Sequence, residues 1–153
     1  KHLNIDLCKL VSWLKANKIS LNTSKTEMLI FRHPNKALNY DLKIKIHGKR
    51  LYPSKFVKYL GILIDPHLNW SHHTQLLAPK LSQAFGMLSK IRHFVSIDHL
   101  RNIYFGIFSS LLMYGAQIWG QQYNHVKRII KLQEEAIRII NFAKYREPTS
   151  KLF

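Results

Sequence analysis

Acidic residues are scarce in this chain, which has 8 Asp and Glu against 24 Lys and Arg and a formal net charge of +16 at pH 7. The few acids are scattered, so a two-metal carboxylate site cannot be assembled from neighbouring positions. The sequence therefore does not favour metal-dependent catalysis by this chain. Its one cysteine, Cys8, excludes an intramolecular disulfide framework and a cysteine-rich zinc site, and is compatible with a reducing compartment.

The motifs of common catalytic sites are also missing. Nothing matches a phosphate-binding glycine loop, a nucleophile elbow or a metal-ligand helix. His67, His72 and His73 lie near one another, but the paired Cys/His spacing of structural zinc is absent, so we predict no metal site.

Only one stretch of the sequence approaches the length of a membrane-spanning apolar run. Residues 102–126 contain no Lys, Arg, Asp or Glu. Their apolar part, residues 103–119, reaches only the short limit of the roughly 17–25 residues that a membrane span requires. A buried helix is the simpler interpretation, and a membrane span is the alternative.

The positive charge is spread along the chain. Residues 1–70 carry 13 basic and 4 acidic side chains, and residues 71–153 carry 11 and 4. Two stretches, 42–64 and 66–97, have no acid at all. Their lysines and arginines lack local acidic neighbours, which favours a polyanionic partner, either nucleic acid or an anionic membrane surface.

The first half mixes one helix with short strands. Leucines at helical spacing predict an amphipathic helix over 3–16, ending near Asn17. The apolar run 26–32 predicts a buried strand that Pro34 and Asn35 interrupt. Strict alternation over 42–47 and a tight turn at Gly48–Lys49 predict a hairpin with residues 50–52. Residues 56–64 form a further strand pattern, in which Gly61 indicates a bulge or close backbone approach.

The second half is helical. One predicted helix starts near Ser71, with Pro79 delaying or kinking it; a second is capped by Ser96 or Asp98, and a third by Asn124. The expected buried stripes are Leu77, Leu81, Ala84, Leu88 and Ile91, then Leu100, Ile103, Tyr104, Ile107, Leu111 and Leu112, then Val126, Ile129, Ile130, Gln133, Ile137 and Ile140. The fold class is therefore α+β: a helix with short antiparallel strands, then a three-helix bundle.

Several motifs occur together in a recognisable order. They are Trp-Leu-Lys-Ala-Asn at 13–17, Lys-Thr-Glu-Met-Leu-Ile-Phe at 25–31, Lys-Tyr-Leu-Gly at 58–61, Leu-Asn-Trp at 68–70, Gly-Met-Leu-Ser-Lys-Ile-Arg at 86–92, Tyr-Gly at 114–115 and Ile-Trp-Gly at 118–120. The ordered set closely resembles the reverse transcriptases (RNA-directed DNA polymerases) of non-LTR, LINE-type retrotransposons, over nearly the whole chain.

The resemblance implies a place within that polymerase. Residues 1–66 correspond to the end of the palm, with the motif D helix and strand, a hairpin and the motif E primer grip; residues 67–153 correspond to the helical thumb. The family's metal-binding Ala-Asp-Asp strand lies upstream of the Trp-Leu-Lys-Ala-Asn helix. We therefore expect a fragment that is inactive alone, with Mg²⁺ required only by the complete enzyme, and an intracellular location in nucleus or cytoplasm.

The resemblance also implies roles for individual residues. Lys25 matches the motif D lysine proposed to assist pyrophosphate departure, where a cation would stabilise the leaving group; solvation of a loop is the alternative. Residues 58–61 match the primer grip, where a glycine lets the backbone approach the primer. The four residues are Lys58, Tyr59, Leu60 and Gly61. We expect Leu60 to be buried and leave Tyr59 open.

Basic residues on the predicted thumb complete the candidate interface. Lys80, Gln83, Met87 and Lys90 share one stripe without acids. The candidates for contact with the duplex backbone are Lys80, Lys90 and Arg92. The basic face of the third helix also carries Glu134 and Glu135 and is expected to be an ordinary solvated surface. The expected partners are an RNA template–DNA primer hybrid and the rest of the polymerase chain, without a membrane. The alternative function is a non-enzymatic basic nucleic-acid-binding module.

Overall fold

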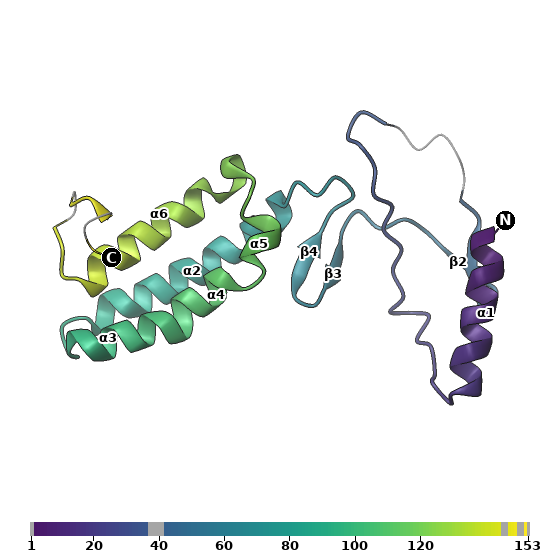
Figure 1. The fold of residues 1–153 in the computed structure, drawn as a ribbon, viewed down its shortest axis with the longest axis horizontal. Helices are drawn as coiled ribbons and strands as arrows, with labels where there is room; N and C mark the ends of the chain where they lie inside the picture. The colour runs from purple at the N-terminus through teal and green to yellow at the C-terminus, as the bar shows by residue number, and fades with distance from the viewer. Residues whose placement is uncertain (1, 37–41, 145–146, 150–151, 153) are drawn as a thin grey trace. The chain divides into compact units, whose positions relative to one another are not determined.

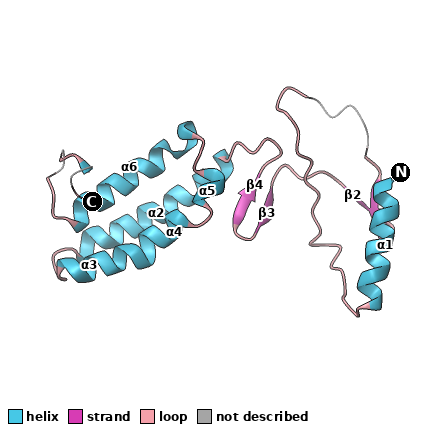
Figure 2. Ribbon diagram, in the orientation of Figure 1, coloured by secondary structure: helices cyan, strands magenta, loops and turns pink. Residues whose placement is uncertain are grey.

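Two compact units make up the chain in the computed structural model, which describes residues 2–36, 42–144, 147–149 and 152 (Figure 1). The first unit is Lys1–Leu68 and the second is Asn69–Phe153. Helices and short antiparallel strand pairs occur together, which confirms the α+β class (Figure 2). The predicted boundary after residue 66 lies close to this division, while the assignment to palm and thumb stays a prediction.

The first unit begins with α1, His2–Ala16, which confirms the predicted helix. Its end is closed by backbone hydrogen bonds from Asn17 N to Trp13 O and from Ile19 N to Leu14 O, at 3.0 and 2.9 Å. The helix contacts β1, but none of its residues is fully buried. Leu3 and Leu10 of the expected apolar stripe are exposed, so the neighbouring strand covers only one flank of that stripe.

Strands β1, Ile44–Ile46, and β2, Lys49–Leu51, form the predicted hairpin. The turn comprises His47 and Gly48, both with positive φ (49° and 74°), one residue earlier than predicted. Two successive residues with positive φ are typical of the turn that matches the twist of a short hairpin. The alternation is confirmed, because Ile44 and Ile46 are buried and Lys45 is exposed.

The predicted strand over 26–32 is wrong. The segment makes a single parallel bridge, Met28 to Pro53, supported by a 2.8 Å hydrogen bond from Ser54 N to Met28 O. Pro53 has no N–H to donate, so the ladder cannot extend through it. Met28 is half-buried and Phe31 is exposed.

Residues 56–64 form a second hairpin instead of one strand. Strand β3 is Val57–Tyr59 and β4 is Ile62–Ile64, paired antiparallel with Tyr59 opposite Ile62. Leu60 and Gly61 form the turn with φ of 46° and 86°. The glycine marks a reversal of the chain, where the pattern alone indicated a bulge.

The second unit is built around α2, Ser71–Ile91, which contacts α6, Tyr123–Ile140, along its length (Figure 1). Pro79 lies inside α2 and does not delay its start. The start follows Trp70, which has a φ of 62°, and Ser71 N donates to Asn69 Oδ1 at 3.0 Å. The predicted α2 stripe is buried except at Ile91, which is half-buried: Leu77, Leu81, Ala84 and Leu88.

The second predicted helix is divided by a wider turn. It comprises α3, Ile97–Ile103, a π-helical segment η1, Tyr104–Ser109, and α4, Ser110–Met113. Its buried residues are Leu100, Tyr104, Phe108 and Leu112. A π turn holds more residues than an α turn, so positions four apart stay aligned. The predicted stripe is thus confirmed at Leu100, Tyr104 and Leu112 and wrong at Ile107, which is exposed, whereas Phe108 is buried.

A short helix, α5, Ala116–Trp119, follows Gly115, whose φ is 65°. Its Trp119 is buried. No helix in the described part of the chain has the length and apolar character needed to cross a membrane.

Candidate nucleic-acid interface

The tip of the β3–β4 hairpin is the most exposed part of the predicted primer grip. Tyr59 is 63% exposed and Leu60 is 72% exposed, and Lys58 is exposed beside them. The expectation that Leu60 is buried is wrong, because Leu60 occupies the turn, where a side chain has no opposite strand to pack against. An aromatic ring, an apolar side chain and a cation therefore lie together at one hairpin end.

The base of this hairpin is held within the first unit. Asp65, which is buried, accepts a hydrogen bond on Oδ1 from His67 N at 2.9 Å. Arg32 N donates to Pro66 O at 3.0 Å, and Arg32 O lies 3.0 Å from His67 Nδ1. These bonds join the segment that leaves the hairpin to the segment around Arg32, so the tip projects from a fixed base.

Lys25 lies in a turn organised by Asn22. The side-chain oxygen of Asn22 accepts from Ser24 N, Ser24 Oγ and Lys25 N at 3.1, 2.6 and 3.2 Å. Such a local turn stabilises the backbone without using the lysine side chain. Lys25 is exposed, as a contact to a bound anion requires.

The predicted stripe on α2 lies on the surface of the second unit. Lys80, Gln83, Met87 and Lys90 are all exposed. At 1.5 Å of rise per residue, the two lysines lie about 15 Å apart along the helix axis. We call these four residues the α2 stripe.

The sequence analysis did not predict one further residue of this surface. Leu76 is exposed one turn before Lys80 and continues the stripe. The spacing of four residues before Lys80 could have identified it from the sequence.

Arg92 differs from the residues of the α2 stripe in its burial and contacts. It follows the end of α2, is half-buried, and its guanidinium lies 5.2 Å from the centre of the Phe142 ring. It also lines a cavity of 330 Å³ beside Glu135 and Arg138. Arg92 is therefore half-buried against Phe142, whereas Lys80 and Lys90 are exposed.

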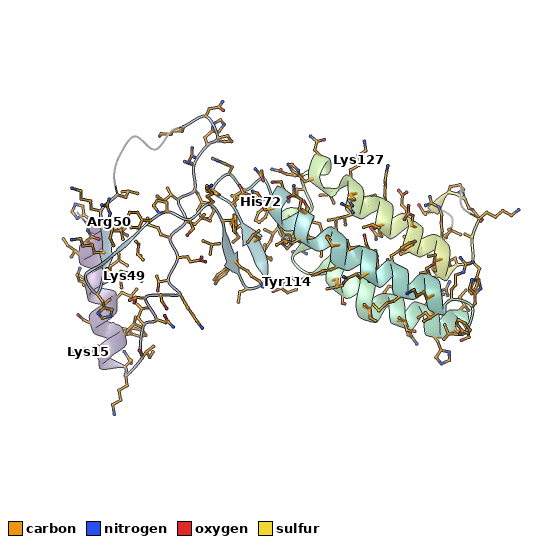
Figure 3. All side chains as sticks on the ribbon, turned by 180° about the vertical axis from the view of Figure 1, so that it is seen from behind. Lys15, Lys49, Arg50, His72, Tyr114 and Lys127 are labelled. Carbon is orange, nitrogen blue, oxygen red and sulfur yellow. The ribbon has the colours of Figure 1, made fainter. Side chains whose placement is uncertain are left out.

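The basic face of α6 is partly neutralised. Arg138 forms an ion pair with Glu134 at 3.7 Å, and its Nε donates to Glu147 O at 3.1 Å. Lys127, Arg128 and Lys131 of the same helix are exposed (Lys127 is labelled in Figure 3).

A histidine lies beneath one end of the α2 stripe. His73 is buried, and its ring centre lies 5.7 Å from that of Trp119. Burial lowers the pKa of His73 below its usual 6.5, and the positive charge of Lys80 lowers this pKa further. His73 is thus mainly neutral at pH 7 and adds little positive charge beside Lys80.

A metal centre does not fit the described residues. No three His, Cys, Asp or Glu side chains among them are grouped closely enough to hold a metal ion. Mg²⁺ in polymerases is held by carboxylates, together with substrate phosphates. The described part of the chain therefore offers no donor set for the Mg²⁺ that the resemblance implies for a complete enzyme.

Comparison with known proteins gives three related sequences. A probable RNA-directed DNA polymerase from the transposon X-element of Drosophila melanogaster is 30% identical over 84% of this chain, and a Pol polyprotein from the type-1 retrotransposable element R1 4 of Nasonia vitripennis is 28% identical over 90%. The RNA-directed DNA polymerase from the mobile element jockey of Drosophila melanogaster is 28% identical over 67%.

This chain is much shorter than these relatives. It spans 14%, 40% and 12% of their respective lengths. No protein-family model matches the chain. No solved structure matches it either.

Proposed function

We propose that this chain, which is similar to the RNA-directed DNA polymerases of non-LTR retrotransposons over 67–90% of its length, is the fragment of such a polymerase that holds a template–primer hybrid. In this proposal the first unit is the end of the palm and the second is the thumb. The chain positions the hybrid, and nucleotide addition belongs to the complete enzyme.

The exposed tip of the β3–β4 hairpin carries this proposal. Tyr59 and Leu60 present an apolar surface to solvent, and Lys58 adds a positive charge next to it. Stacking of a base on an aromatic side chain contributes about 1–3 kcal/mol and tolerates any base. The tip therefore suits the end of a primer strand, whose sequence changes at every site.

The α2 stripe supports the same proposal through charge. Lys80 and Lys90 are exposed cations on one side of one helix, and the stretch from 66 to 97 contains no acid. Contacts to phosphates fix the position of a duplex without reading its sequence, and RNA-containing helices are recognised mainly by shape and backbone. A surface of this kind allows a polymerase to hold any template.

Lys25 has a separate proposed role near the incoming nucleotide. Its backbone is fixed by the Asn22 turn while its side chain remains exposed. An ammonium group in that place would stabilise the negative charge that develops on departing pyrophosphate. Mg²⁺ would be bound by carboxylates of the complete enzyme, because the described residues offer no suitable group.

Binding to a labelled RNA/DNA hybrid tests the proposal. We expect fluorescence anisotropy to show an affinity that falls with salt, with a slope of log K against log salt near −5 if about six phosphates are neutralised. The double variant Tyr59→Ala/Leu60→Ala should weaken binding by at least about fivefold, the lower limit for one lost stacked base. The control is Phe94→Ala, which removes an 86%-exposed aromatic ring outside the hairpin. Equal affinities of the two variants would refute the role of the tip.

The even spread of charge favours a second candidate, a basic nucleic-acid-binding module without a polymerase role. Such a module would bind blunt duplex DNA, single strands and recessed hybrids alike. We expect instead a preference for a hybrid with a recessed primer end, and that this preference disappears in Tyr59→Ala/Leu60→Ala.

A further inference from the structure

The second unit contains a cavity of 330 Å³ between α2 and α6. The two helices end side by side, because the guanidinium of Arg92, just after α2, lies 5.2 Å from the centre of the Phe142 ring, just after α6 (Figure 1). Ligand sites in proteins have volumes of about 300–1,000 Å³, so there is room here for one small ligand. The residues that line this α2–α6 cavity are Phe85, Arg92, Glu135, Arg138, Ile139 and Ala143.

Glu135 is the acceptor of the α2–α6 cavity. The residue is half-buried, and its carboxylate forms no ion pair or hydrogen bond with another described residue. The neighbouring Glu134 pairs with Arg138 instead, at 3.7 Å. An ionised carboxylate can only accept hydrogen bonds, and its partial burial without a donor costs free energy. A ligand that brings N–H donors to Glu135 would recover this cost.

Arg92 supplies charge of the opposite sign to the same cavity. It is half-buried against Phe142 and forms no ion pair with an acid of the described residues. Its Nε is buried and has no hydrogen-bond partner in the described part of the chain, so a ligand would be bound by the terminal N–H groups. These groups donate in pairs to neighbouring acceptors. The ligand should therefore carry acceptors as well as donors.

Guanine combines these two properties in one planar ring system. Its N1–H and N2–H groups are adjacent donors that match a carboxylate, and its O6 and N7 are the acceptors that arginine binds most often. Adenine, cytosine and uracil each present an acceptor beside their donor, and that acceptor would be repelled by a carboxylate. The apolar side chains of Phe85 and Ile139 in the cavity wall suit the faces of a base.

We propose that the α2–α6 cavity binds the base of an unpaired guanine nucleotide, with Glu135 accepting from N1 and N2 and Arg92 donating to O6 and N7. A paired guanine uses its N1–H and N2–H groups for cytosine, so the base must come from an unpaired position. The inference rests on the proposed binding of nucleic acid. It adds a preference for one base, which neither the β3–β4 tip nor the α2 stripe provides.

Fluorescence anisotropy of the full chain tests the inference with two single-stranded RNAs, a uridine oligonucleotide and the same oligonucleotide with one central guanosine. We expect the second to bind at least about fivefold more tightly, the lower limit for a bidentate base contact. Glu135→Gln should bind both equally. The matched control Glu134→Gln removes the same charge from the adjacent position, which does not line the cavity, and should keep the preference.

Base analogues test the two contacts without changing the protein. Inosine lacks the N2 amino group and 7-deazaguanosine lacks N7, so each should reduce the preference of the wild-type chain. Arg92→Gln should no longer distinguish guanosine from 7-deazaguanosine, while it should still distinguish guanosine from inosine. A preference that neither analogue reduces would refute the assigned contacts.

The remaining outcomes separate this inference from the proposed function. Equal binding of the two oligonucleotides by the wild-type chain refutes the guanine site and leaves the proposed function standing, because the tip and the α2 stripe do not read bases. Absence of binding to any nucleic acid refutes both.

Competition identifies the source of the base. GMP should displace the guanosine-containing oligonucleotide only weakly, because it lacks the further backbone contacts of a strand, and AMP should not displace it. Displacement by GMP at concentrations near the Kd of the oligonucleotide would overturn the strand as the source and assign the cavity to a free nucleotide.

Discussion

Trp119 donates a hydrogen bond from its indole Nε1 to the backbone oxygen of Tyr114 at 3.0 Å. The two residues lie on either side of the Gly115 turn, and the Trp119 ring is 1% exposed. This bond joins the end of α4 to α5, and Trp119 is among the largest fully buried side chains, so we expect a strong effect of substitution.

Two substitutions of Trp119 should destabilise the second unit to different extents. Trp119→Phe keeps an aromatic ring and loses the donor, which costs about 1 kcal/mol or more. Trp119→Ala leaves a cavity and costs about 3–5 kcal/mol. Urea unfolding measures both, with Ile118→Ala as control because Ile118 is 54% exposed on the same short helix. Equal effects of Trp119→Ala and Ile118→Ala would contradict the buried position.

Acidification should weaken the second unit through His73. Its pKa in the folded protein is lower than its usual 6.5 because the side chain is buried, so the unfolded chain binds a proton more readily. Stability is therefore fully present above about pH 6.5 and falls as the pH decreases from there through the lowered pKa of the folded state. Urea midpoints across this range should show a steeper fall for the wild type than for His73→Gln. A wild-type protein that becomes more stable relative to His73→Gln on acidification would contradict the predicted sign.

Gly61 should resist substitution because of its backbone conformation. With a φ of 86°, an alanine at this position is strained by about 1–2 kcal/mol. Gly61→Ala should therefore destabilise the β3–β4 hairpin and weaken hybrid binding. Gly86→Ala is the matched control, because Gly86 lies within α2 with open space around its Cα. There alanine should stabilise the helix by about 0.5–1 kcal/mol. Identical responses at the two glycines would contradict this assignment.

Asn4 should control the stability of the β1–β2 hairpin. Asn4→Ala removes the hydrogen bonds to Lys43 O and from Lys45 N, at a cost of about 1 kcal/mol because the site is exposed. Hydrogen exchange of the Lys45 amide should accelerate. Ser12→Ala, which removes only a bond to Cys8 O within α1, should leave that exchange rate unchanged. An unchanged Lys45 rate in Asn4→Ala would show that α1 does not hold this strand.

Local patterns predicted the elements whose stability is local. The helix ending at Ala16, the alternation around Ile44 and the stripe of α2 follow from spacing that one element alone provides. The turn at Leu60 was not predicted, because a single run of apolar residues is typical of one strand. Only the pairing of β3 with β4 shows that this run reverses direction. The strand at Met28 was also predicted from an apolar run alone. It does not form, because the residue that bridges to Met28 is Pro53, which has no N–H to continue the ladder.

The sequence by itself determined the excess of positive charge, the α+β class and the similarity to retrotransposon polymerases, because each depends on composition or on the order of residues. Only the tertiary structure decided that Leu60 is exposed, that Phe108 replaces Ile107 in the core, and that Arg92 is half-buried against Phe142. Burial and neighbourhood depend on which distant segments pack together, and no local spacing contains that information.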